Sequence, residues 1–182
     1  MVTMDALMAA VPQIQAAPKD ATVARLLTFR PARNERQHPG HLVLTRERGI
    51  PGERWLTEPW LKLPDGSPDP SIQVSILPTR VHDLVRPDPG AAVHPGDTIL
   101  ADLDTSVANL PEGAVLQAGS ARLRVSPVFN NACVKWKVRY GRDAMDWVNL
   151  PQHRDLRLRG ILCAIIEDGE IRQGDPITVV SR

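Results

Sequence analysis

The sequence predicts a mainly β fold of the α+β class, a β-barrel or β-rich domain with a few short helices. Short apolar stretches are separated by turn-forming residues throughout, and the 182 residues include 17 prolines and 12 glycines. Such spacing is typical of many short strands joined by turns. Helical segments do not alternate regularly with the apolar stretches, which disfavours a parallel sheet built from β-α-β units.

The first 21 residues are expected to form an extension ahead of a single domain over residues 22–182. Apolar side chains recur at helical spacing after Thr3, a residue that can cap a helix, so a short surface helix is predicted there. Residues 15–20 are expected to be a linker. The extension lacks the basic flank of a secretory signal, and its apolar run is too short to span a bilayer. Together with two isolated cysteines, this favours a cytoplasmic protein without a membrane partner.

Eight segments are expected to be strands: residues 22–28, 41–44, 71–77, 98–103, 115–117, 121–125, 158–166 and 177–180. Residues 71–77 alternate in character, and so do residues 121–125, where Arg122 and Arg124 oppose apolar neighbours. A period of two is typical of strands with one buried face. Residues 158–166 form a nearly continuous apolar run, which predicts a strand buried on both faces.

Two helical segments and one hairpin complete the expected elements. Helical turns are expected at residues 80–85 and 142–149, and the second stops before Pro151 because a proline disfavours helical geometry in the residue ahead of it. Asp168-Gly169 lies between two apolar runs, the strongest short-range signal for a hairpin turn in the chain. The strands on either side of this pair are therefore expected to form a hairpin.

The charge balance excludes one broad class of function. The chain has 22 Lys and Arg against 21 Asp and Glu, a formal net charge of +1, whereas a general nucleic-acid binder needs a basic excess to neutralise phosphates. The charges are unevenly spread, however. Residues 122–159 contain nine basic and three acidic side chains, and the rest of the chain contains 13 basic and 18 acidic ones. That segment is suited to an anionic small molecule.

Common catalytic and metal-binding motifs are absent from the sequence. It contains no phosphate-binding glycine motif, no serine-hydrolase motif and no paired metal ligands. The five histidines are isolated, at His38, His41, His82, His94 and His153. A structural zinc site is therefore not expected. Asp102 and Asp104 alternate along an expected strand, where a solvated face is a simpler explanation than a general acid–base pair.

Residues 130–141 (NNACVKWKVRYG) contain the strongest candidate site. If this segment is extended, alternation places one thiol and three cations on the same face: Cys133, Lys135, Lys137 and Arg139. Val134, Trp136, Val138 and Tyr140 then face the core. Neighbouring positive charge favours a thiolate, so Cys133 is expected to be the more nucleophilic cysteine, and the cations can hold a phosphate. An edge strand with solvated lysines and an inert thiol fits the same pattern equally well.

Two further features carry weaker signals. Cys163 lies inside an apolar run and is expected to be a small buried residue, although the sequence leaves a disulfide between Cys133 and Cys163 open. In residues 48–55 (RGIPGERW), two glycines around Pro51 allow a sharp turn, and Arg54 can bind an anion. A plain surface turn explains that loop as well.

In order and spacing, these segments resemble the MOSC family, the molybdenum-cofactor sulfurase C-terminal domain, in its stand-alone bacterial form. The likeness runs from about Thr22 to Val180. The matching motifs are Arg30-Pro31, Gly49-Ile-Pro-Gly-Glu-Arg54, Asn131-x-Cys133-x-Lys135 with Arg139 and Gly141, Leu158-Arg-Gly-Ile161, Asp168-Gly169 and Gly174-Asp-Pro176. One position departs from the family pattern. The chain has Glu53 where the family usually has Asp.

The resemblance implies a MOSC-type β-barrel with a site centred on Cys133. The bound group would be the molybdenum cofactor (molybdopterin), and Cys133 would act as the metal ligand or carry sulfur as a persulfide. Implied activities are sulfur transfer or reduction of N-hydroxylated compounds. Cations near the cysteine would bind the cofactor's phosphate. The residues assigned to cofactor binding are Lys135, Lys137, Arg139, Arg54, Asn131, Glu53 and Arg159, with Arg157 beside them.

The resemblance also implies partners. A cysteine desulfurase or an electron-donor protein would act in trans, on a small-molecule substrate, and pyridoxal phosphate is not expected on this chain. Two other functions remain open. The protein could be a metal-independent thiol enzyme, or a non-catalytic sulfur carrier that binds a partner enzyme.

Overall fold

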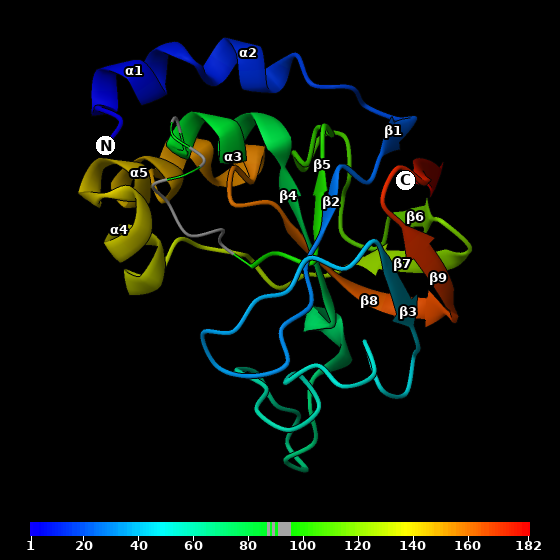
Figure 1. Ribbon diagram of the computed structural model, residues 1–182. Helices are drawn as coiled ribbons and strands as arrows, with labels where there is room; N and C mark the ends of the chain where they lie inside the picture. The colour runs from blue at the N-terminus through cyan, green and yellow to red at the C-terminus, as the bar shows by residue number, and fades with distance from the viewer. Residues whose placement is uncertain (87, 89, 91–95) are drawn as a thin grey trace.

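Two sheets and a layer of helices form the structure, a computed structural model that describes residues 1–86, 88, 90 and 96–182. The larger sheet has eight strands in the order β1-β10-β6-β7-β8-β4-β5-β2 and curls into a half-barrel (Figure 1). Its strands are β1 (Thr22–Val23), β2 (Leu26–Leu27), β4 (Val74–Pro78), β5 (Ile99–Ala101), β6 (Val115–Ala118), β7 (Ala121–Val125), β8 (Ile161–Glu167) and β10 (Pro176–Ser181). The smaller sheet pairs β3 (His41–Leu44) with β9 (Gly169–Arg172). The prediction of a mainly β fold is confirmed.

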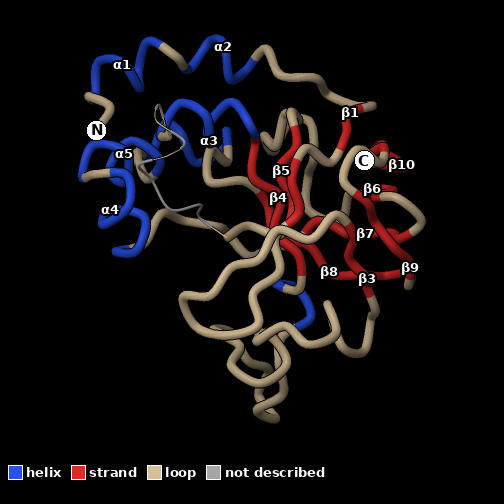
Figure 2. Tube along the Cα trace, in the orientation of Figure 1, coloured by secondary structure: helices blue, strands red, loops and turns tan. Residues whose placement is uncertain are grey.

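Short helices gather at one side of the larger sheet (Figure 2). They are α1 (Met4–Ala9), α2 (Val11–Gln15), α3 (Thr79–Val85), α4 (Val134–Tyr140) and α5 (Arg142–Val148). Of the two 3-10 turns, Pro151–Leu156 follows α5, whereas Pro70–Ile72 lies apart from the helices, just before β4. The helical predictions for residues 80–85 and 142–149 are confirmed as α3 and α5. In the part of the chain that the structure describes, no helix is both long and apolar enough to cross a membrane.

Strand β4 separates two hydrophobic clusters. All five of its residues are buried, and successive side chains of a strand point to opposite faces. Val74 and Ile76 lie in the cluster enclosed by the curled sheet, whereas Leu77 packs in the cluster under the helices, together with Trp136 and Trp147. The helical layer is therefore attached to the sheet through the strand that leads into α3.

The expected strand at residues 22–28 is divided in two. β1 pairs with β10 and β2 pairs with β5, at opposite edges of the larger sheet. Only Ala24 and Arg25 separate the two strands, so this short segment joins the two edges of the curled sheet. The expected strand at residues 71–77 also begins late. Asp69 caps a 3-10 turn there, because its Oδ1 accepts a hydrogen bond from the backbone N–H of Ser71 at 2.8 Å.

The predicted hairpin at Asp168-Gly169 is wrong. β8 pairs with β4 and β7 in the larger sheet, whereas β9 pairs with β3 in the smaller one. The tight hairpin turn would need positive φ angles, and Gly169 does not have one. A Cβ atom on Gly169 would lie 2.5 Å from the backbone nitrogen of Ala121. The glycine is needed for this close approach, at the point where the chain passes from one sheet to the other.

Residues 130–141 are not a strand, and the predicted stripe of alternating cations is wrong. The segment forms α4, in which Trp136 and Tyr140 are buried one helical turn apart and their rings meet edge to face at 4.7 Å. Val134 and Val138, expected to face the core, are 72% and 75% exposed. Trp136 also donates a hydrogen bond through Nε1 to the carbonyl of Ala144 at 3.3 Å. The two buried aromatic rings therefore fix which side of the helix faces the protein.

The predicted N-terminal helix is confirmed as α1. Thr3 caps it, with Oγ1 accepting a hydrogen bond from the backbone N–H of Ala6. Leu7 is fully buried, and the backbone N–H of Met4 donates to Oδ2 of Asp143 in α5 at 3.0 Å. The helix is thus packed against α5. The expected linker at residues 15–20 begins at the last residue of α2.

Candidate functional site

A cavity of about 640 Å³ lies between α4 and the larger sheet. Its walls come from loops at residues 30–36 and 54–60, residues 96–97 ahead of β5, and residues 128–139, together with Ser75 in β4, Arg159 ahead of β8 and Leu162 in β8. The cavity size is that of a small-molecule or cofactor site. Segments far apart in the sequence therefore meet at one place.

Cys133 lies at the mouth of this cavity, at the residue directly before α4. It is exposed and free, whereas Cys163 is fully buried in β8 and also free. Burial raises the pKa of the Cys163 thiol to about 12. Cys163 is the buried residue that the sequence predicted, and the open question of a disulfide is settled. Cys133 is the thiol that solvent can reach.

Two asparagines hold the backbone ahead of Cys133. Asn149 accepts a hydrogen bond from the backbone N–H of Ala132 at 3.0 Å and donates one to the carbonyl of Ala132 at 2.8 Å. Asn130 donates through Nδ2 to the carbonyl of Arg159 at 2.9 Å. These contacts attach the cysteine loop to the end of α5 and to the segment before β8. The position of Cys133 is thus fixed through the residues just before it, Asn130 and Ala132, which these contacts hold in place.

Cations line the cavity beyond the thiol. They are Arg30, Arg36, Arg54, Lys135, Arg139 and Arg159. Lys135 and Arg139 are four residues apart, so they lie on the same side of α4. Burial lowers the pKa of Lys135, and the neighbouring charges of Arg54 and Arg33 lower it further. This crowding of like charges indicates a site suited to an anion.

Arg30 is fixed in the wall by the buried carboxylate of Glu53. Nε and Nη2 of Arg30 donate to Oε1 and Oε2 of Glu53 at 2.9 and 2.7 Å. Burial lowers the pKa of Arg30, but the charges of Glu53 and Asp97 and the hydrogen bonds to Glu53 outweigh that effect and raise it overall. Glu53 itself does not line the cavity. Its place is behind Arg30.

Arg159 also lines the cavity and pairs with Asp97. Its Nη1 donates to Oδ1 of Asp97 at 2.7 Å, and its guanidinium lies 4.6 Å from the centre of the Trp136 ring. The Asp97 side chain is only 3% exposed. Among the described residues, Oδ2 of Asp97 has no hydrogen-bond partner.

The structure gathers six of the proposed site residues at this cavity: Asn131, Cys133, Lys135, Arg139, Arg54 and Arg159. Lys137 is exposed and is not among the described residues of the wall. The acidic pair is not at the site either. Asp102 pairs with Arg80 at 2.7 Å, and Asp104 accepts a hydrogen bond from the backbone of Ser106.

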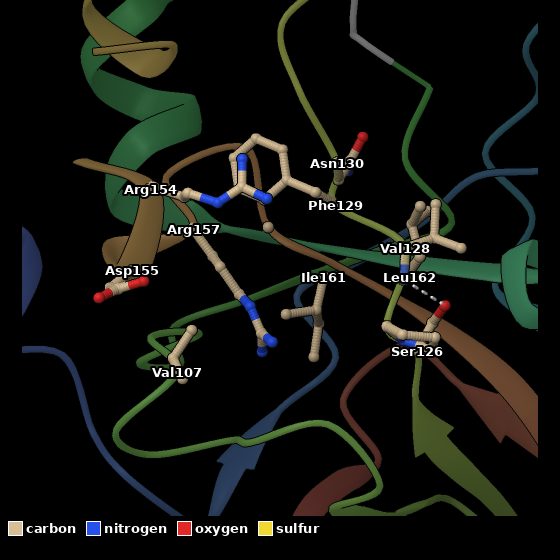
Figure 3. Close-up of a pocket in the computed structure, with 12 residues that line it drawn as sticks. Val107, Ser126, Val128, Phe129, Asn130, Arg154, Asp155, Arg157, Ile161 and Leu162 are labelled. Carbon is tan, nitrogen blue, oxygen red and sulfur yellow. Dashed lines mark hydrogen bonds between the residues drawn. The ribbon is translucent and has the colours of Figure 1, made fainter. Parts of the chain in front are cut away.

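Arg157 lines a second, smaller pocket of about 180 Å³, drawn in Figure 3. There it donates a hydrogen bond to the carbonyl of Leu110 at 2.6 Å, while the guanidinium of Arg154 lies 4.7 Å from the centre of the Phe129 ring. Residues 128–130 and Leu162 line both cavities. This segment therefore forms the partition between them, and Arg157 is on the far side from Cys133.

Several wall residues were not singled out from the sequence, namely Arg36, Ser75, Asp97 and Trp60. Ser75 and Asp97 reach the cavity only because β4 and β5 pair in parallel, a long-range contact that no local pattern marks. In the described part of the chain, no three His, Cys, Asp or Glu side chains are grouped so as to hold a metal ion. His94 lies outside the described residues.

Comparison with protein families finds a match over part of the chain. Residues 96–178 match the MOSC domain model. This range includes Asp97, Cys133 and Arg159, while Arg30 and Arg54 precede it. No curated protein matches the chain in sequence.

Solved structures share the fold at low sequence identity. YuaD from Bacillus subtilis is 16% identical, with a TM-score of 0.57 over 89% of this chain and 97% of that one. YiiM from Escherichia coli is 21% identical, with a TM-score of 0.56 over 91% of this chain and 71% of that one. YiiM from Geobacillus stearothermophilus is 12% identical, with a TM-score of 0.56 over 88% of this chain and 76% of that one. The match over residues 96–178 and the curled sheet with its few short helices show that this chain contains a segment similar to the MOSC domain and has a MOSC-type fold.

Proposed function

We propose that the cavity binds the molybdenum cofactor, with the Cys133 thiolate as the protein ligand of the metal. The observation that carries the proposal is the position of one exposed, free thiol at the mouth of a cavity lined by six cations. A thiolate is a soft ligand of the kind that transition metals bound to sulfur accept. The cations supply the contacts that a phosphate needs.

The residues of the wall fit such a group. The cavity of about 640 Å³ lies within the size range of cofactor sites. Lys135, Arg139 and Arg54 are grouped on the side of α4 and would hold the phosphate. Arg30 is held by two hydrogen bonds to Glu53 and adds a further cation to the wall. When bound, the cofactor would supply a redox-active metal that exchanges oxygen or sulfur.

The proposed reaction is the two-electron reduction of an N-hydroxylated compound. Cleavage of the N–O bond consumes two electrons and two protons and releases the amine and water. The electrons would come from a donor protein in trans. The role of this chain is to hold the substrate beside Cys133 and to keep the site open to solvent on that side, since Cys133 is exposed.

A second candidate, a persulfide carrier, is favoured by one specific observation. Cys133 is exposed while Cys163 is fully buried, so a persulfide on Cys133 would have no neighbouring thiol of this chain to reduce it. A cysteine desulfurase would supply the sulfur. Incubation with a desulfurase and labelled cysteine, followed by mass spectrometry, tests this candidate. Label on Cys133 supports it, and an unlabelled Cys133 contradicts it.

The primary proposal is tested by the metal and pterin content of the purified protein. The protein is produced in a host that makes the cofactor, as wild type, Cys133→Ser, Lys135→Ala and Lys137→Ala. We expect molybdenum and pterin in the wild type and in Lys137→Ala, a loss of molybdenum in Cys133→Ser, and reduced content of both in Lys135→Ala. A wild-type protein that holds neither contradicts the proposal.

A further inference from the structure

Two arginines line the smaller pocket of about 180 Å³, Arg154 and Arg157 (Figure 3). Among the ion pairs of the described residues, none includes either guanidinium. The Arg157 side chain donates through Nη1 to the carbonyl of Leu110 at 2.6 Å, and Arg154 lies over the ring of Phe129. Two positive charges therefore line one small space, and no described carboxylate pairs with either.

The backbone of Arg157 is held in a conformation that side-chain-bearing residues rarely adopt. Its φ of +47° and ψ of +49° are left-handed, and this region costs a non-glycine residue free energy. The carbonyl of Arg157 accepts hydrogen bonds from Oγ1 of Thr105 at 3.1 Å and from the backbone N–H of Gly160 at 2.7 Å. In this conformation the guanidinium points into the pocket, between Val107 and Ile161 (Figure 3).

The surroundings of Arg157 disfavour its positive charge. Burial lowers the pKa of Arg157, because the charged form loses hydration there. Part of the wall is apolar, including Val107, Ile161 and Leu162. Asp155 lines the pocket too, but it is exposed, and its carboxylate lies away from the Arg157 guanidinium in Figure 3. A half-buried cation in such surroundings is stabilised by an anion.

The chemistry and the size of the pocket restrict what that anion can be. A guanidinium is a planar fork whose parallel N–H groups fit the oxygens of a carboxylate or a phosphate. The volume of about 180 Å³ is smaller than that of a cofactor site. Arg154 and Asp155 are exposed on the wall, so the pocket can be reached from solvent on their side. The ligand that fits is therefore a small oxyanion.

We propose that the smaller pocket is a second binding site of this protein, which holds a small oxyanion on the guanidinium of Arg157. Arg154 adds a second positive charge from the exposed side. The ligand is inorganic phosphate or a small molecule with a phosphate or carboxylate group. Residues 128–130 separate it from the cavity at Cys133. The inference therefore does not depend on the proposed cofactor.

The test is an NMR titration of backbone amides in the full chain at low ionic strength. The probes are inorganic phosphate, sulfate and acetate, with sodium chloride as the control for ionic strength. Amides of Val107 and Ile161 report on the smaller pocket, and amides of Lys135 and Val138 report on the cavity at Cys133. We expect saturable shifts at Val107 and Ile161 with an oxyanion but not with chloride. Comparison of acetate with phosphate distinguishes a carboxylate ligand from a phosphate ligand.

Three variants assign the binding to the arginines. Arg157→Gln removes the charge and keeps an amide that can donate to the carbonyl of Leu110, and it should weaken binding at least about tenfold. Arg154→Gln should weaken it about threefold. Arg124→Gln is the matched control and should change nothing, because Arg124 is an exposed arginine on β7 that is not among the described residues of either wall. The response of the Lys135 amide should be the same in all three.

Two results would overturn the inference. One is the lack of a saturable shift at Val107 and Ile161 with all three oxyanions, and the other is an unchanged affinity in Arg157→Gln. If Arg157→Gln does not fold, Arg154→Gln decides, since its position is exposed. Saturable binding that Arg154→Gln weakens then supports the site, and saturable binding that it leaves unchanged contradicts it.

Discussion

Glu53 holds Arg30 through three hydrogen bonds, donated by Nε, Nη2 and the backbone N–H of the arginine at 2.9, 2.7 and 3.1 Å. The carboxylate is 1% exposed and the arginine side chain 22%. This pair joins the glycine-containing loop before Arg54 to the loop after β2. It also explains the residue at position 53. The longer carboxylate supports a wall residue from behind and is not itself part of the wall.

Replacing Glu53 is expected to destabilise the protein. Glu53→Gln removes the charge and turns an NH₂ group toward Arg30, so the variant should lose about 3 kcal/mol of unfolding free energy. Glu53→Asp keeps the charge but has a shorter side chain. Its unfolding free energy should therefore lie between those of the wild type and Glu53→Gln. Urea denaturation measures both values. A Glu53→Gln variant as stable as the wild type would show that the pair is not structural.

Lys135 and Lys137 are expected to differ, because they lie on different sides of a helix. Lys135→Ala should weaken binding of pyrophosphate about tenfold, since it removes a cation from the cavity wall, and Lys137→Ala should change it by less than about twofold. Isothermal titration at low salt gives both affinities. Equal losses in the two variants would be expected of an extended strand and would argue against the helical site.

Stability is expected to fall at high pH because of Cys163. Burial raises the pKa of this thiol from 9.0 to about 12, so the unfolded chain releases the proton above about pH 9 while the native chain keeps it. The unfolded state then binds fewer protons, and the unfolding free energy decreases as pH rises. The loss between pH 8 and pH 10.5 should be about 2 kcal/mol.

Cys163→Ala serves as the control for this pH effect. The variant should lose less stability than the wild type between the two pH values, whatever its stability at pH 8. The remaining loss would come from groups such as Tyr140, whose pKa burial raises to about 12. Urea denaturation of both proteins at both pH values gives the comparison. Identical losses would mean that Cys163 does not titrate as its burial requires.

Two glycines with similar backbone angles are expected to respond differently to alanine. Gly160 and Gly174 have φ angles of +79° and +93°, which favour glycine in both cases. A Cβ atom on Gly160 would lie 2.0 Å from the carbonyl oxygen of Ile76, whereas one on Gly174 meets nothing within 4 Å. Gly174→Ala should therefore cost about 1 kcal/mol.

Gly160→Ala should cost at least about 3 kcal/mol, because the backbone of β4 must move as well. Thermal or urea unfolding of the two variants tests the difference. Equal costs would show that the close approach between Gly160 and β4 is not tight in solution. Since Gly160 follows Arg159, the same variant should also disturb the site.

Local patterns in the sequence were sufficient for elements whose neighbours are close in the chain. The alternation in residues 121–125 predicted β7 correctly, with Arg122 and Arg124 turned away from the core. The cap at Thr3 predicted α1. The same logic failed at residues 130–141, because Trp136 and Tyr140 are four apart and fit both a strand and a helix. Only the exposure of Val134 and Val138 distinguishes the two.

Long-range contacts determined what the sequence did not predict. Gly169 looked like a turn residue, yet its role is to pass close to Ala121. Asp97 and Arg36 carried no local signal, since strand pairing and loop packing bring them to the cavity. The resemblance to the MOSC family supplied the position of Cys133, and the basic segment at residues 122–159 supplied the expectation of an anionic ligand. The cations from the loops at residues 30–36 complete that site.

The central claim, that Cys133 is a ligand of molybdenum, is tested most directly by X-ray absorption at the molybdenum edge. The measurement compares wild-type protein and Cys133→Ser, both loaded in a host that makes the cofactor. We predict one more sulfur neighbour of the metal in the wild type than in the variant. The same number of sulfur neighbours in both proteins, or no molybdenum in the wild type, would contradict the claim.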